Sequence, residues 1–174
     1  NVVNPDDVVK QFGADAFRLY EMFIAPFEST VSWNTDGLVG TLRFIEKIWR
    51  VSEKATASES DLELQKTLHK TIKKVGEDIE SFKFNTAVSA LMILGNAMES
   101  AQNISRDDFK KVLQILAPFA PHISEELWHE LGETESIHLA SWPIYDESKI
   151  VDDTVTLGVQ VNGKVRAEVT IAHD

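Results

Sequence analysis

The chain has 174 residues, no cysteine, and 28 acidic against 17 basic residues, which gives a formal net charge of −11. Its 43% apolar and 26% charged residues are ordinary for a globular protein and suffice to bury a core. The missing cysteines exclude disulfides and thiolate metal sites, no apolar run approaches the roughly 20 residues that cross a bilayer, and the net charge by itself disfavours nucleic acid.

The first block, residues 1–46, predicts two short helices that lead into a longer one. Asn4 or Asp6 can cap the first helix, because both side chains can accept from backbone N–H groups of a first turn. Gly13 separates the two short helices, and Pro26 ends the second.

A long helix is expected over residues 37–54. Its apolar side follows a helical spacing through Leu38, Leu42, Ile45 and Trp49, widened by Phe44, Ile48 and Val51. Four cations recur with the same spacing: Arg43, Lys47, Arg50 and Lys54. In an acidic chain, this row is the clearest candidate for a phosphate-facing surface. The alternative is a solvated face that compensates its own charges, since Glu46 lies four residues before Arg50.

The middle of the chain, residues 47–150, predicts an antiparallel bundle of helices followed by an extended arm. Its strongest amphipathic pattern runs over residues 64–82. Gly95 costs about 1 kcal/mol relative to Ala in the middle of a helix, which indicates a close approach between two helices. Ser105 and Asp108 resemble a capping box at the start of another helix.

The segment LAPFAPHISEELWHEL, residues 116–131, contains two prolines three positions apart. The first stops the arriving helix, and the second suits the first turn of a new one. We therefore predict a rigid helix–elbow–helix with both aromatic residues in the core. The histidine is interpreted first as a residue near a helix start and second as an RNA contact. The five positions concerned are Pro118, Phe119, Pro121, His122 and Trp128.

Residues 151–174 predict a β-hairpin, because two runs of alternating apolar residues flank Asn162-Gly163. Matching the apolar residues pairs Leu157 with Val169, Val159 with Ala167 and Val161 with Val165. This register requires either a three-residue loop, 162–164, or a bulge beside the turn.

No catalytic motif is present in the sequence. There is no Gly-rich phosphate loop, no H-E-x-x-H and no G-x-S-x-G, and the five histidines show no metal-ligand spacing. We expect the isolated chain to have no catalytic residue, no metal site and no enzyme activity.

Several segments resemble one protein family. PFAPHISEELW, residues 118–128, resembles the anticodon-binding domain of class I aminoacyl-tRNA synthetases for aliphatic amino acids. The opening 20 residues resemble the segment after the K-M-S-K-S loop of leucyl-tRNA synthetases, and residues 33–49 resemble a later helix of that family. The Trp142-Pro143 junction and VQVNGKVRAEV, residues 159–169, are similar to the start of the small C-terminal domain of the bacterial type.

This resemblance implies a mainly α protein with three parts: stem-contact helices (1–46), an anticodon-binding-like bundle with an extended arm (47–150) and a hairpin from a truncated C-terminal domain (151–174). The chain starts with Asn1, and we expect it to belong to a longer cytoplasmic leucine–tRNA ligase whose catalytic and editing domains lie upstream. That enzyme uses ATP with magnesium to charge leucine tRNA. The fragment itself would hold no cofactor and would be a monomer, unless truncation lets hairpins of two copies pair.

The family's bundle grips the tRNA body rather than reading the anticodon. The resemblance therefore implies backbone contacts from the helix cations and from two more on the hairpin. The candidate tRNA-binding residues are Arg43, Lys47, Arg50, Lys54, Lys164 and Arg166. Two alternatives remain open: a helical protein–protein interaction module, suggested by the acidic charge, or the same domain from a valyl- or isoleucyl-tRNA synthetase.

Overall fold

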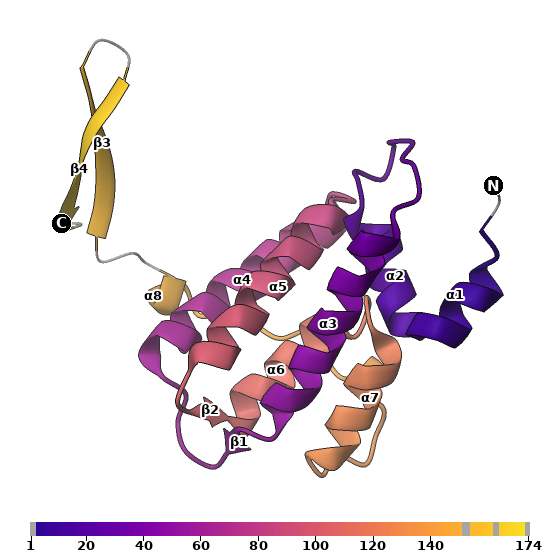
Figure 1. Cartoon of the computed structure of the whole chain (residues 1–174). Helices are drawn as coiled ribbons and strands as arrows, with labels where there is room; N and C mark the ends of the chain where they lie inside the picture. The colour runs from indigo at the N-terminus through magenta and orange to yellow at the C-terminus, as the bar shows by residue number, and fades with distance from the viewer. Residues whose placement is uncertain (1–2, 151–153, 162–163, 173–174) are drawn as a thin grey trace.

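The computed structural model describes residues 3–150 in full and residues 154–161 and 164–172 as backbone strands. The chain is mainly helical and ends in a two-stranded hairpin, which confirms the predicted fold class (Figure 1). The helices are α1 (Pro5–Phe12), α2 (Ala14–Phe23), α3 (Thr35–Ser52), α4 (Leu62–Glu80), α5 (Phe84–Ser100), α6 (Arg106–Leu116), α7 (Pro121–Glu130), the 3₁₀ helix η1 (Ile137–Leu139) and α8 (Glu147–Ile150). Among these described helices, none is long and apolar enough to span a membrane.

The caps and breaks of the first helices follow the sequence closely. Of the two candidate caps, Asn4 acts on α1, because its side chain accepts from the N–H of Asp6 at 3.1 Å. Gly13 joins α1 to α2 at a φ of +86°, a conformation that glycine adopts without the steric cost of a side chain. The segment between α2 and α3 is irregular, and Asn34 caps α3.

The buried side of α3 differs from the predicted apolar row. Phe44, Ile48 and Val51 lie in the core, whereas Trp49 is 44% exposed, so the prediction that Trp49 marks the buried side was wrong. The physical reason is that α3 packs between α2 and α5. These contacts bury the part of the wide apolar surface of α3 that carries Phe44, Ile48 and Val51, and they leave Trp49 partly exposed.

A close approach of α3 and α5 at Gly95 confirms the interpretation of that glycine. A Cβ atom at position 95 would lie 2.9 Å from Cε2 of the buried Phe44 ring. The missing side chain lets the two helices meet at the centre of the bundle.

The hydrophobic core is built from residues of most of the described helices. One cluster of buried residues includes Leu19 of α2 together with residues from α3 to α7. A smaller cluster joins Val8, Tyr20 and Leu38 from the first three helices. The predicted boundary between residues 46 and 47 falls inside the single helix α3.

The two strand pairs are short. β1 (Ala55–Thr56) and β2 (Ile104–Ser105) form a parallel pair that was not predicted from the sequence. β3 (Thr154–Val161) and β4 (Lys164–Ala172) pair antiparallel.

The hairpin register resolves the choice left by the sequence. Leu157 pairs with Val169 and Val159 with Ala167, as predicted, but Val161 pairs with Lys164 instead of Val165. The register shifts beside Val159, so a bulge accommodates the apolar match. The predicted turn residues 162–163 lie outside the described residues.

We predict opposite effects of the same substitution at two helical glycines. Gly95→Ala should lower the free energy of unfolding by about 1–2 kcal/mol, because the new methyl group strikes the Phe44 ring. Gly40→Ala on α3 should raise it by roughly 0.5–1 kcal/mol, because nothing lies within 4 Å of its Cβ position and Ala favours a helix. Urea unfolding of both variants measures this. Stabilisation by Gly95→Ala would contradict the close approach.

Candidate nucleic-acid interface

The corner between α6 and α7 is capped by a carboxylate from far away in the sequence. We call residues 117–120 the elbow; α6 ends and α7 begins on either side of it, as predicted. Ala120 occupies the N-cap position and offers no side-chain acceptor. Instead, the buried Asp15 of α2 accepts from the N–H of Ile123 at 2.8 Å and from the N–H of His122 at 3.3 Å. Its Oδ1 also lies 2.7 Å from His122 Nδ1.

The elbow's carbonyl groups are held by the same helix. Arg18, three residues after Asp15, donates from Nη2 to Pro118 O at 2.8 Å and from Nε to Phe119 O at 3.3 Å. Two charged side chains of α2 therefore pair with backbone donors in the first turn of α7 and with backbone acceptors in the elbow.

The remaining residues of the corner motif also have structural partners. Phe119 and Trp128 are buried as predicted, and Trp128 Nε1 donates to Glu135 O at 3.0 Å. Glu125 accepts from Ser136 Oγ at 3.1 Å and from the N–H of Ile137 at 3.0 Å. Desolvation opposes these hydrogen bonds, but together they lower the pKa of Glu125. The motif is thus explained by folding contacts, and the RNA contact of His122 stays a prediction.

Two of the four predicted cations meet one acid of α5; Arg43, Lys47 and Arg50 lie on α3, whereas Lys54 lies in the turn after it. Lys47 Nζ lies 3.0 Å from Glu99 Oε2 and also donates to Asn96 Oδ1. Arg50 Nη2 lies 3.4 Å from Glu99 Oε1. The hydrogen bonds from Lys47 and from Arg50 lower the pKa of the Glu99 carboxyl. Arg50 therefore pairs across to α5 rather than with Glu46 on its own helix.

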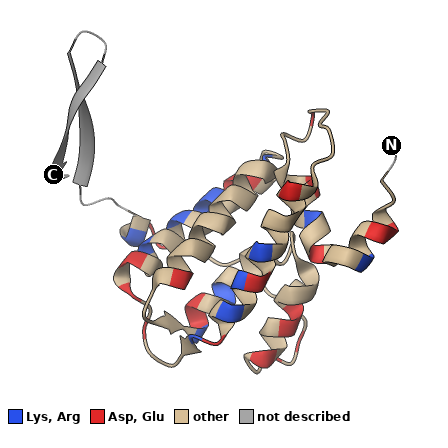
Figure 2. Cartoon of the chain, viewed as in Figure 1, with Lys and Arg blue, Asp and Glu red and all other residues tan. Residues whose placement is uncertain are grey.

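The other two cations differ from each other. Lys54 donates to Glu99 O at 2.6 Å and to Ala101 O at 3.5 Å, so it neutralises the carbonyl end of α5. Arg43 is exposed and makes no hydrogen bond or ion pair within residues 3–150. Figure 2 shows blue segments along α3 and α4, whereas α7 carries red ones.

The two hairpin candidates flank the turn. Lys164 opens β4 opposite Val161. Arg166 lies at the register shift, between paired positions 165 and 167.

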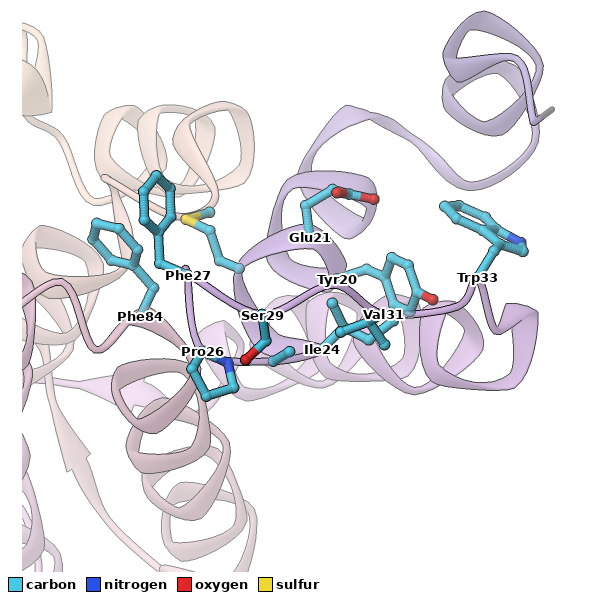
Figure 3. Close-up of a pocket in the computed structure, with 11 residues that line it drawn as sticks. Tyr20, Glu21, Ile24, Pro26, Phe27, Ser29, Val31, Trp33 and Phe84 are labelled. Atoms are coloured by element: carbon cyan, nitrogen blue, oxygen red, sulfur yellow. The ribbon is translucent and has the colours of Figure 1, made fainter.

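An apolar cleft of about 490 Å³ lies beside α2 and the irregular segment that follows it. Tyr20, Pro26, Phe27 and Trp33 line it together with Phe84 of α5 (Figure 3). Glu21 is its charged lining residue, and no Lys or Arg of the described chain lines it. The cleft therefore offers apolar contact and does not offer a phosphate site. Nor does any group of three His, Asp or Glu in the described chain form a candidate metal site.

Comparisons with known proteins identify the family to which this chain belongs. Residues 61–174 match the protein family described as "Anticodon-binding domain of tRNA ligase". The chain belongs to this family. The matched part begins just before α4 and includes the elbow and the hairpin.

Individual relatives agree with this family and narrow it. A leucine–tRNA ligase of Alkaliphilus oremlandii (strain OhILAs) is 47% identical over 175 residues, covering 100% of this chain and 22% of the relative. A solved structure titled as the ternary complex of Agrobacterium radiobacter K84 agnB2 LeuRS-tRNA-LeuAMS superposes with a TM-score of 0.80 at 30% identity, over 99% of this chain and 24% of that one. These findings confirm the resemblance to leucyl-tRNA synthetases. The chain spans about a fifth to a quarter of those proteins.

The capping role of Asp15 is testable. Asp15→Ala should lower the free energy of unfolding by about 2–3 kcal/mol, because it leaves the Ile123 N–H without its charged acceptor. Asp7→Ala, at an exposed acid in the first turn of α1, should change it by less than about 0.5 kcal/mol. Chemical unfolding gives both values. Equal losses of unfolding free energy in the two variants would contradict a stabilising cap by Asp15.

Proposed function

We propose that this chain is the tRNA-positioning part of a leucine–tRNA ligase. It would hold leucine tRNA while other domains of the longer protein carry out ATP-dependent aminoacylation. The observation that carries this proposal is similarity along the whole chain to a leucine–tRNA ligase, at 47% identity. In this proposal, ATP and magnesium would bind to the catalytic domain of the longer protein.

The contacts of α3 suggest which cations would meet the tRNA backbone. Lys47 is only 20% exposed in its side chain and is fixed by α5, whereas the side chain of Arg50 is 59% exposed. An exposed ion pair contributes about 0–1 kcal/mol, so Arg50 can exchange Glu99 for a phosphate at little cost. Arg43 has no described partner to give up. We infer that Arg43 and Arg50 contact phosphates, and that Lys47 and Lys54 hold α3 on α5.

The acidic net charge is compatible with this proposal, because phosphate responds to the charge of the surface that it approaches. Beyond about 10 Å, acids on other faces are largely screened at ordinary salt. Lys164 and Arg166 on the hairpin remain proposed contacts, and we expect the isolated chain to be a monomer. A protein–protein interaction module is less favoured, because the family match is to a domain of tRNA ligases.

Measuring the affinity of this chain for leucine tRNA at several salt concentrations tests the proposal. The double variant Arg43→Glu with Arg50→Glu should weaken binding at least about tenfold at low salt. It should also reduce the slope of log affinity against log salt by about two, one for each lost phosphate contact.

The matched control is Lys83→Glu, which reverses an exposed charge in the turn between α4 and α5. This variant should retain both the affinity and the slope. If the double variant behaves like Lys83→Glu, α3 does not face the tRNA. If the unchanged chain binds no tRNA even at low salt, the proposed function itself fails.

A further inference from the structure

His69 is a buried histidine that joins the bundle to the segment leading toward the hairpin. It lies on α4 and is 4% exposed. Its Nδ1 accepts a hydrogen bond from the N–H of Asp146 at 3.0 Å. Its Nε2 is buried and has no partner among the described residues.

Asp146 belongs to the arm, by which we mean residues 140–150 from the end of η1 through α8. The arm makes further contacts with two helices, α4 and α6. Gln114 of α6 donates to Ser141 O at 3.0 Å, Lys149 donates to Gln65 Oε1 at 2.7 Å, and Lys73 lies 5.5 Å from the centre of the Tyr145 ring. These are exposed or partly buried polar contacts, each worth about 1 kcal/mol or less. The hydrogen bond to His69 is partly buried as well, and it differs from the others in that its acceptor is a side chain only 4% exposed.

The chemistry of this bond requires a neutral imidazole. A backbone N–H can donate only to a ring nitrogen that carries a lone pair, so Nδ1 of His69 must be unprotonated. The proton of the neutral ring then resides on Nε2. A second proton would place an N–H of the ring against the N–H of Asp146, and it would put a positive charge in a buried site.

The charges around His69 come from both sides of the contact. From α6 they are Lys111 and Asp108, which are paired with each other at 2.8 Å, and from the arm they are Lys149 and Asp146. Burial lowers the pKa of His69, and Lys111 and Lys149 lower it further, while Asp108 and Asp146 oppose them. On α4 itself, Lys73 faces the Tyr145 ring, and Lys66 and Lys70 are engaged in interactions of their own.

We propose that neutral His69 is the latch that fixes the arm on the bundle, and that protonation of this one side chain releases the arm. The arm leads to β3 and β4, which carry Lys164 and Arg166. Its attachment would therefore set where those two cations can meet a tRNA. That consequence rests on the proposed function, whereas release of the arm does not.

The direction of the pH effect follows from the lowered pKa. Above the ordinary histidine value of 6.5, the ring is neutral whether the arm is attached or free, and the attachment is at full strength. Below 6.5, the ring exposed by the freed arm binds a proton more readily than the latched ring, whose pKa is lowered. Attachment therefore weakens as the pH falls, by up to about tenfold in the opening constant for each pH unit below that value.

Hydrogen exchange measured by mass spectrometry tests the latch on this chain without any tRNA. Protection of residues 139–150, corrected for intrinsic exchange, should fall up to about tenfold between about pH 7.5 and about pH 5.5. Protection of α6 over the same range reports whether the bundle itself unfolds. In His69→Asn, whose side-chain oxygen can accept near the Nδ1 position but does not titrate, the arm should lose this pH dependence.

His138→Asn is the matched control, because His138 is exposed and lies two residues before the arm. Its pH response should equal that of the unchanged chain. The latch is refuted if the arm's protection is independent of pH, or if His69→Asn keeps the same dependence. Proton NMR gives a second reading, since the ring of His69 should titrate below 6.5. Titration at or above 6.5 would also overturn the proposal. None of these outcomes affects the tRNA-binding measurement with the Arg43→Glu and Arg50→Glu double variant, so the two proposals can fail separately.

Discussion

The carboxylate of Asp15 joins parts of the chain that lie more than a hundred residues apart, and the arrangement of the bundle depends on it. Two prolines create the elbow, and Ala120 at the N-cap position leaves α7 without a side-chain cap of its own. Asp15 supplies that cap, and Arg18 on the next turn of α2 takes the elbow's free carbonyl groups. Hydrogen bonds to charged groups contribute about 1.5–3 kcal/mol each, a large fraction of the stability of an ordinary domain.

Once α2 is fixed on α7, α3 has little freedom. Thr41 of α3 donates its hydroxyl to Ala16 O of α2 at 2.9 Å, and Gly95 lets α3 approach α5 on the other side. Glu99 and the end of α5 then hold Lys47, Arg50 and Lys54. The acid that neutralises part of the cationic row also orders it. Such an ordered cationic surface favours binding of a nucleic-acid backbone, because the protein side chains lose less conformational freedom when the complex forms.

Local features of the fold could be predicted from the sequence, and features that depend on distant contacts could not. The cap at Asn4, the double-proline corner and the Ser105 side chain that accepts from the N–H of Asp108 involve neighbours within a few residues. The predicted capping box at Ser105 is only half formed, because the N–H of Ser105 donates to Ser60 Oγ instead of to Asp108. The hairpin bulge was one of two solutions that apolar matching allowed. By contrast, no local pattern links Asp15 to His122, and periodicity could not show which side of the wide apolar surface of α3 would be covered. Trp49 was misplaced for that reason.

In the candidate site too, local features could be predicted from the sequence and distant contacts could not. The helical spacing of the four cations was visible in the sequence, but Glu99 lies on another helix and was not recognised as the partner of Lys47 and Arg50. His69 carried no motif, and its role follows only from the arm that folds over it. The apolar cleft beside α2 was also missed, because its lining comes from an irregular segment together with Phe84.

The central claim is that the outward face of α3 lies against the tRNA body. Hydroxyl-radical footprinting of this chain with and without leucine tRNA tests it most directly, because it compares the reactive exposed side chains of α3 and α7 in one experiment. The claim predicts that tRNA protects the exposed side chains of α3, including Trp49, and leaves the acidic outer face of α7 as reactive as before. Protection of α7 with an unprotected α3 would contradict it.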